Sequence, residues 1–157
     1  MATKPRDTLD RQLQKLFDEI LLIGSMVENA TMDAVVALKN RDLVKARQTY
    51  DGDQKINAKR FEIEKDVMIL ISTQQPMARD ARILASVLEV ANELERMGDY
   101  AKGIARICIL MADYPPVKPM VDIPRMAETA VGMLHTALDA FTSFDDKLAW
   151  EISKKDE

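Results

Sequence analysis

The residues best placed for chemistry lie in the stretch ANELERMGDYAKGIA, residues 91–105, where Glu95 and Asp99 stand four positions apart. On a helix this spacing puts both carboxylates on one face, a turn apart. Close carboxylates repel, and partly buried ones need a proton, a base or a cation nearby. Their oxygens suit multivalent cations. The pair therefore predicts either a metal site or a solvated acidic face, and such pairs are common on ordinary helices.

An apolar stripe leads up to this acidic pair. Leu84, Leu88 and Ala91 lie on the same side of the expected helix as the acids. Gly98, between the acids, removes a side chain that would otherwise shield them. The metal interpretation thus stays open beside the simpler one of a solvated surface.

Other patterns that carry catalysis are missing from the sequence. His135 is far from the acidic pair, and Glu93 is followed three positions later by Arg96, not by the His that di-iron carboxylate bundles require. We find no glycine-rich phosphate loop, no nucleophile with a base and no HExxH motif. Cys108 lies among apolar residues and is expected to be a small buried hydrophobe. The sequence therefore predicts no enzyme.

Long amphipathic helices are expected to position these residues. Apolar residues alternate in spacings of four and three and predict a first helix over 7–39, with the stripe Leu9, Leu13, Leu16, Ile20, Ile23, Val27, Ala30, Ala34 and Ala37. Asp42 is placed to cap a second helix over 43–71. This helix is the most polar, because Asp53 and Asn57 interrupt its stripe of Ala46, Tyr50, Ile56, Ile63, Val67 and Leu70.

The acidic pair falls on a third helix. Ser72 and Thr73 are possible caps for it, Pro76 suits its first turn, and it is expected to reach Asp113. Its regular apolar stripe, called its seam below, consists of Ile83, Val87, Val90, Leu94, Met97, Ala101, Ile104, Cys108 and Met111. The predicted fold class is all-α, an antiparallel three-helix bundle.

The chain divides into three predicted parts. Residues 1–113 form the first three-helix unit, and residues 114–124, with four of the six prolines, form a linker. Residues 125–157 resemble part of the first unit in two stretches. At an offset of 100, Met126, Glu128, Ala130, Ala137 and Leu138 match Met26, Glu28, Ala30, Ala37 and Leu38. With three extra residues near the turn, Asp145, Ala149 and Asp156 match Asp42, Ala46 and Asp53. We therefore expect an incomplete second unit with weakly anchored final helices.

The composition limits the class of partner and the location. The 157 residues are 47% apolar and 31% charged with a net charge of −4, and no basic block suggests nucleic acid. The first residues lack the apolar core of a secretory signal. The longest apolar run, around ILLIGSMV, is short for a membrane span. A cytoplasmic protein without membrane insertion is expected.

Two motifs resemble a known family. QQPMARDAR at residues 74–82 and ELERMGDYAKGIA at residues 93–105 closely resemble the PhoU family of phosphate-transport regulators. The resemblance covers residues 7–113 and implies repeated three-helix units with metal bound at the acidic motif in some members. It implies Glu95 and Asp99 as metal ligands and Asn92, Glu93 and Arg96 as flanking residues. Asp53 and Asn57 are possible contributors from the second helix, although relatives often have an acid where this chain has Asn57.

The family also implies a function. It predicts a cytoplasmic, non-enzymatic adaptor that restrains phosphate uptake and the phosphate-starvation response. Its implied partners are the ATP-binding subunit of a phosphate ABC transporter and a membrane sensor histidine kinase. The expected cofactor is a multivalent ion, iron, zinc, manganese or magnesium, and a homodimer is expected because apolar residues such as Val131, Leu134 and Leu138 would otherwise stay exposed. A metal-storage or metal-sensing bundle and a purely structural helical protein are the alternatives.

Overall fold

The computed structural model describes residues 5–115 and 118–154, and five α-helices account for nearly all of them. They are α1 (Pro5–Asn40), α2 (Leu43–Gln74), α3 (Ala78–Leu110), α4 (Asp122–Ser143) and α5 (Asp146–Ser153). No strand occurs in this described part of the chain. The predicted all-α class is confirmed.

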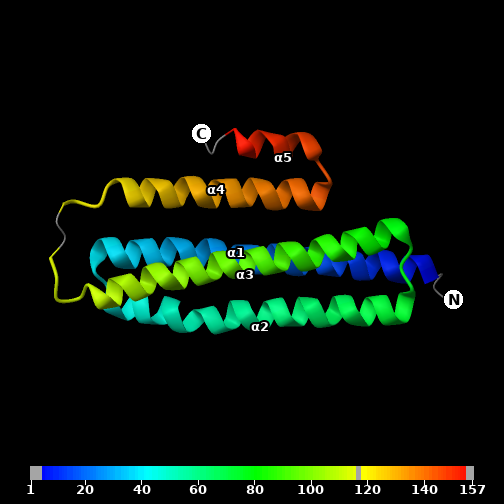
Figure 1. The fold of residues 1–157 in the computed structure, drawn as a ribbon, viewed down its shortest axis with the longest axis horizontal. Helices are drawn as coiled ribbons and strands as arrows, with labels where there is room; N and C mark the ends of the chain where they lie inside the picture. The colour runs from blue at the N-terminus through cyan, green and yellow to red at the C-terminus, as the bar shows by residue number, and fades with distance from the viewer. Residues whose placement is uncertain (1–4, 116–117, 155–157) are drawn as a thin grey trace.

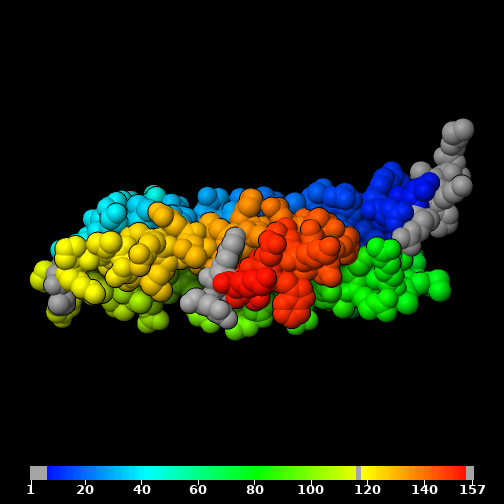
Figure 2. Space-filling view, turned by 90° about the horizontal axis from the view of Figure 1, so that it is seen from above, coloured from blue at the N-terminus to red at the C-terminus, as the bar shows by residue number. Residues whose placement is uncertain are grey.

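The first three helices form an antiparallel bundle in which each packs against the other two (Figure 1). α4 lies antiparallel to α1 on the outside of this bundle, and among the described elements α5 contacts only α4. In space-filling view α4 and α5 cover one side of an elongated molecule (Figure 2). The expectation that the last helices are weakly anchored therefore fits α5 and is wrong for α4.

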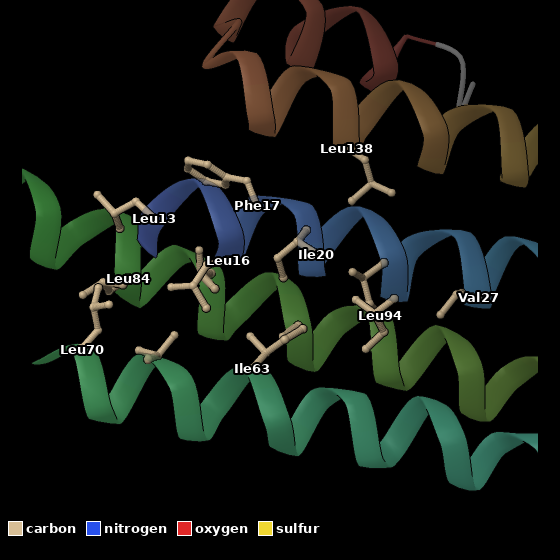
Figure 3. Close-up of a cluster of buried hydrophobic side chains, with 14 of the residues drawn as sticks. Leu13, Leu16, Phe17, Ile20, Val27, Ile63, Leu70, Leu84, Leu94 and Leu138 are labelled. Atoms are coloured by element: carbon tan, nitrogen blue, oxygen red, sulfur yellow. The ribbon is translucent and has the colours of Figure 1, made fainter. Parts of the chain in front are cut away.

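The core follows the predicted stripe of the first helix. Leu16, Ile20 and Ile23 are almost completely buried, and Figure 3 shows α1 side chains meeting Leu84 and Leu94 of α3 and Ile63 of α2. Of the predicted α1 stripe, only Ala30 is merely half-buried. Burial of this continuous apolar face supplies the main driving force for the bundle.

The buried face of α3 differs from its predicted seam. Val87, Leu94, Ala101 and Cys108 are buried as expected, but their buried neighbours are Leu84, Ala91, Gly98 and Ala105. The other seam members Ile83, Val90, Met97 and Ile104 are half-buried, and Met111 is exposed. Because α3 contacts both α1 and α2, its buried face is wider than the predicted stripe and is turned about the helix axis relative to it.

The start of α3 also differs from the prediction. Ser72 and Thr73 belong to the last turn of α2, where both hydroxyls donate to the carbonyl oxygen of Ile69. Met77 occupies the N-cap position of α3 without a side-chain hydrogen bond, so Pro76 precedes the helix. α2 thus continues past Ile71 because these hydroxyls find backbone acceptors within their own helix.

Two turns in the chain have nearly the same geometry. Asp42 caps α2 by accepting a hydrogen bond from the Lys45 amide at 2.9 Å, and Asp145 caps α5 in the same way from Leu148 at 3.0 Å. In each turn the residue before the aspartate has a φ of 56°. These are positions that the sequence comparison of the two segments aligned, so the similarity between them extends to the local backbone.

α4 begins earlier than predicted and packs on α1. Its first residue is Asp122, within the segment 114–124 that was expected to be a linker, and Pro124 lies in its first turn, where no amide donor is needed. Leu134 and Leu138 are buried, which corrects the expectation that they remain exposed. An added Cβ on Gly24 of α1 would lie only 2.3 Å from Leu138 Cδ1, so the glycine makes room for this leucine.

One described helix, α1, passes a length-and-composition test for a membrane span. By length and composition alone, α1 contains a segment apolar enough to cross a membrane, with a mean hydropathy of 1.4. The core helix of a soluble protein passes the same test. Here the apolar stripe of α1 contacts α2, α3 and α4, and its members Leu16, Ile20 and Ile23 are buried.

Candidate functional site

The acidic motif lies where α3 crosses close to α2. Gly98 is buried, and a Cβ added to it would lie 3.1 Å from Ile56 Cδ1 and 3.2 Å from Ile56 Cγ2. The sequence interpretation that Gly98 uncovers the acidic pair is therefore wrong, because the missing side chain serves close helix packing. The same approach brings polar side chains of α2 next to the motif.

Asp53 of α2 is the buried acid of the site. It is only 3% exposed, and its Oδ2 accepts hydrogen bonds from Lys102 Nζ at 2.7 Å and from Asn57 Nδ2 at 3.0 Å. Lys102 belongs to α3, so this ion pair joins the two helices. A buried carboxylate is tolerated because an opposite charge and hydrogen bonds compensate for its lost hydration.

Asp99 meets the same lysine from its own helix. Its Oδ1 lies 3.6 Å from Lys102 Nζ, and its side chain is 53% exposed. Lys102 Nζ also lies 5.6 Å from the centre of the Tyr50 ring, at the edge of the cation–π range. Tyr50 itself is exposed at 37%, so its predicted place in the buried stripe is wrong. Lys102 thus lies between a buried and an exposed carboxylate.

Glu95 is half-buried on α3, one turn before Asp99. None of the ion pairs found among the described residues involves Glu95. Its carboxylate and that of Asp99 remain on one side of the helix, as the four-residue spacing predicts. The pair therefore presents an acidic face at the α2–α3 seam.

The flanking motif residues make contacts of their own. Asn92 Oδ1 accepts a hydrogen bond from Arg60 Nη1 of α2 at 3.1 Å. Arg96 binds Glu93 on the same helix, with 2.7 Å between Nη1 and Oε1. Arg96 is thus engaged with Glu93, and the positive charge beside Asp99 comes from Lys102.

Hydrogen bonding further favours the charged form of the central lysine. The hydrogen bond to Asp53 raises the pKa of Lys102 above its usual value, with a smaller contribution from the Asp99 charge. Lys102 therefore carries a full positive charge at neutral pH. The cluster joins one ammonium to two carboxylates, and Glu95 adds a third negative group nearby.

The oxygen atoms of the cluster are suitable ligands for a hard cation. Asp53 Oδ1 is buried and has no hydrogen-bond partner among the described side chains, so an acceptor remains unused beside the lysine. Carboxylate and amide oxygens are the ligands that multivalent cations prefer. Within residues 5–115 and 118–154, no group of three or more His, Cys, Asp or Glu side chains is already arranged around a common point. Glu95 and Asp99 would hold an ion, which would supply positive charge to the acidic face.

Two residues outside this cluster were also considered from the sequence. Cys108 is buried, its Sγ lies 3.4 Å from the Ala37 carbonyl oxygen, and burial raises its pKa, so it stays a thiol that fills space. His135 has a side chain 69% exposed and lies 3.3 Å from Glu28 of α1. Cys108 is the small buried hydrophobe that the sequence predicted, and His135 lies on α4, away from the acidic pair.

Sequence reasoning missed Lys102. A basic residue three positions after Asp99 can contact it on a helix, and that spacing was the available signal. Its stronger contact, with Asp53, joins residues 49 positions apart and depends on the packing of α2 against α3.

Comparison with known proteins identifies a family with this architecture. A sequence profile described as PhoU domain matches residues 9–108. The phosphate-specific transport system accessory protein PhoU homolog of Aquifex aeolicus (strain VF5) is 31% identical over 149 residues, covering 95% of this chain and 67% of that protein. The accessory protein PhoU of Escherichia coli (strain K12) is 29% identical over 145 residues, and the match spans 60% of its length.

Solved structures agree with these sequence matches. The crystal structure of PhoU from Pseudomonas aeruginosa superposes with a TM-score of 0.86 at 30% identity, covering 94% of this chain and 71% of that one. PhoU from Streptococcus pneumoniae gives the same TM-score at 27% identity. The fold and the helix-three motif thus define an all-α bundle of the class found in phosphate transport accessory proteins. The chain belongs to the PhoU family.

Proposed function

We propose that this chain is a cytoplasmic, non-enzymatic adaptor that restrains phosphate uptake and the phosphate-starvation response. The observation that carries the proposal is the match, over more than nine-tenths of the chain, to proteins named as accessory proteins of the phosphate-specific transport system. Its partners would be the ATP-binding subunit of a phosphate ABC transporter and a membrane sensor histidine kinase. An accessory protein acts through contact, so its helix faces are the relevant surfaces.

The outer faces of the bundle offer such contact surfaces. Phe61, Met68 and Ile69 of α2 are exposed at 58, 56 and 45%, and Tyr100 and Ile107 of α3 at 68 and 48%. Apolar side chains along a helix provide anchors for a partner helix at three- and four-residue spacings. These exposed apolar side chains on α2 and α3 support an adaptor role.

A pull-down from phosphate-replete cells tests the adaptor. The tagged chain should retain the transporter ATPase or the sensor kinase, and Glu95→Ala with Asp99→Ala should reduce that recovery several-fold. Asp18→Ala with Glu89→Ala is the matched control, because it removes two exposed acids that lie outside the motif. Recovery of neither partner by the unaltered chain would contradict the adaptor role.

We also propose that Glu95 and Asp99 bind a multivalent ion, with iron, zinc, manganese and magnesium as candidates. The unused buried acceptor of Asp53 supports a cation near this face. Purified protein is expected to retain metal that the Glu95→Ala, Asp99→Ala variant loses and the Asp18→Ala, Glu89→Ala control keeps, as elemental analysis would show. Equal metal content in all three proteins would remove the pair from the site.

A homodimer is the third part of the proposal. Phe144 and Trp150, beside the α4–α5 turn and on α5, are exposed at 55 and 73%, and pairing with a second copy would cover them. Light scattering should show a mass that rises with concentration, and Trp150→Ser should weaken this association. Val44→Ser, at a residue of α2 that is 68% exposed, is the control. A monomer at every concentration would contradict the proposal.

A further inference from the structure

The acidic motif already contains a positive group, and it comes from the protein itself. Asp53 is buried, and its Oδ2 accepts hydrogen bonds from Lys102 and Asn57, while Asp99 of α3 contacts the same ammonium. A lone buried carboxylate would be strongly unfavourable, so this position requires a cation. In the structure that cation is the lysine ammonium.

The position is open enough for exchange. The side chain of Lys102 is 32% exposed and that of Asp99 is 53% exposed, so the ammonium reaches Asp53 from the solvent side. The lysine stem is flexible, and its head can move into water without unfolding either helix. An ion entering from solvent would reach the same two carboxylates.

The lysine leaves part of the site unused. Asp53 Oδ2 carries both hydrogen bonds, while Oδ1 is buried without one. A divalent ion holds several oxygens at once, including both oxygens of one carboxylate, whereas an ammonium offers only directed donors. The carboxylate oxygens of Asp53 and Asp99 therefore have more capacity than Lys102 satisfies.

We propose that Lys102 is an internal counter-ion that occupies the position between Asp53 and Asp99 and thereby limits binding of divalent metal to the acidic motif. This inference rests on the proposed metal binding by Glu95 and Asp99. Metal loading would require the lysine head to move outward, so the residue sets the metal concentration at which the motif fills. Two positive charges within a few ångströms repel, which makes the two occupants exclusive.

Metal affinity of a lysine variant tests this directly. Lys102→Met keeps the apolar stem and removes the charge, and it is expected to bind Mn²⁺ at least tenfold more tightly than the unaltered chain in equilibrium dialysis. Lys45→Met is the matched control, because Lys45 also pairs with an aspartate, Asp33 at 2.6 Å, and is 34% exposed. The control should bind Mn²⁺ as the unaltered chain does.

Thermal unfolding provides an independent measurement. Without metal, Lys102→Met should unfold at a lower temperature, because Asp53 loses its counter-charge, and added Mn²⁺ should restore most of the loss. Adding Asp53→Ala to Lys102→Met should remove both the gain in affinity and the rescue. Lys102→Gln, which keeps a hydrogen-bond donor, is the second variant if Lys102→Met does not fold.

The outcomes separate the inference from the proposed function. If the unaltered chain binds Mn²⁺, unchanged or weaker binding by both lysine variants would overturn the role of Lys102 alone. If no protein binds Mn²⁺, the proposed metal site fails, and the role of Lys102 fails with it. Tighter binding that persists after Asp53→Ala would overturn it too, because the ion would lie elsewhere. None of these results bears on the adaptor role, which the pull-down of transporter proteins tests separately.

Discussion

At the scale of single residues, the central feature is a buried aspartate whose stability depends on a lysine from the next helix. Asp53 is 3% exposed, and the ammonium of Lys102 lies 2.7 Å from its Oδ2. Removing one member of a buried pair costs more than the pair contributes, because the remaining charge has no partner. The lysine is about one-third exposed, so solvent reduces this effect without abolishing it.

The pH dependence of stability should reveal this pair. Lys102→Met is expected to lower the free energy of unfolding by about 2 kcal/mol at neutral pH. Because the pKa of Lys102 in the folded chain is raised above its ordinary value of 10.5, its contribution is fully present below pH 10.5 and is lost as the pH rises through the folded pKa. Denaturant unfolding of both proteins from about pH 7 to about pH 11.5 measures the difference. A difference that does not shrink toward the alkaline end would contradict the assignment of the effect to the ammonium charge.

Sequence reasoning reached the acidic site only in part. The four-residue spacing correctly placed Glu95 and Asp99 on one side of α3, because helical geometry is local. It could not pair Asp53 with Lys102, since that contact depends on the rotation of α3 against α2. It also gave Gly98 the wrong role, because only the packed helices show that Ile56 lies against it.

At the scale of elements, two glycines of α3 differ in their surroundings: one packs against α2 and the other faces open space. Gly98 faces Ile56 of α2, whereas a Cβ on Gly103 would meet no atom within 4 Å. Glycine inside a helix costs about 1 kcal/mol relative to alanine, so Gly103 gives up stability without a visible packing benefit. Gly98 offsets the same loss by allowing the close approach that brings Asp53 to Lys102.

Alanine at each of these glycines should give opposite results. Gly103→Ala is expected to raise the free energy of unfolding by about 1 kcal/mol through helix propensity. Gly98→Ala gains the same propensity but forces Ile56 aside, and a net loss of about 1 kcal/mol is expected. Chemical denaturation measures both, and Ile56→Val should relieve part of the Gly98→Ala loss in a double-mutant cycle. Equal stabilisation by both alanines would show that the α2–α3 contact adapts without cost.

The helices themselves were largely predictable, and their ends were less so. The four-three alternation located α1, α2 and α3 because one apolar face repeats over many turns. The linker boundary was wrong because α4 accepts Pro124 in its first turn. The predicted caps Ser72 and Thr73 were wrong because hydroxyls serve equally well inside a last turn. Proline and hydroxyl residues therefore indicate that a helix ends nearby, but not at which residue.

At the scale of the whole molecule, α4 joins the bundle through one helix face. Leu138 lies over Gly24 of α1, and Phe141 contacts Phe17 edge to face, with ring centres 5.7 Å apart. His135 adds a polar contact with Glu28 at 3.3 Å. α5 contacts only α4 among the described elements, so the position of both helices on the bundle depends on this α1–α4 contact. Figure 3 shows Leu138 directed from α4 toward α1.

Filling the space above Gly24 should detach α4 while the three-helix bundle stays folded. In Gly24→Leu the new side chain occupies the position of Leu138, where a Cβ alone would lie 2.3 Å from Cδ1. Alanine is a weaker test, because the end of a leucine side chain can rotate away. Hydrogen exchange should show α4 amides losing at least tenfold protection in Gly24→Leu, with α1, α2 and α3 little changed.

The control for this experiment lies on α4 itself. Gly132→Leu adds the same side chain where a Cβ would meet no atom within 4 Å, so α4 should keep its protection. Loss of protection throughout Gly24→Leu would show that α4 and the bundle unfold as one cooperative unit, because α1 would then depend on α4 for its own stability. Unchanged α4 protection would mean that Phe17, Phe141 and Glu28 hold the helix without Leu138. Local loss alone would establish α1–α3 as a core that folds independently of the helices docked on it.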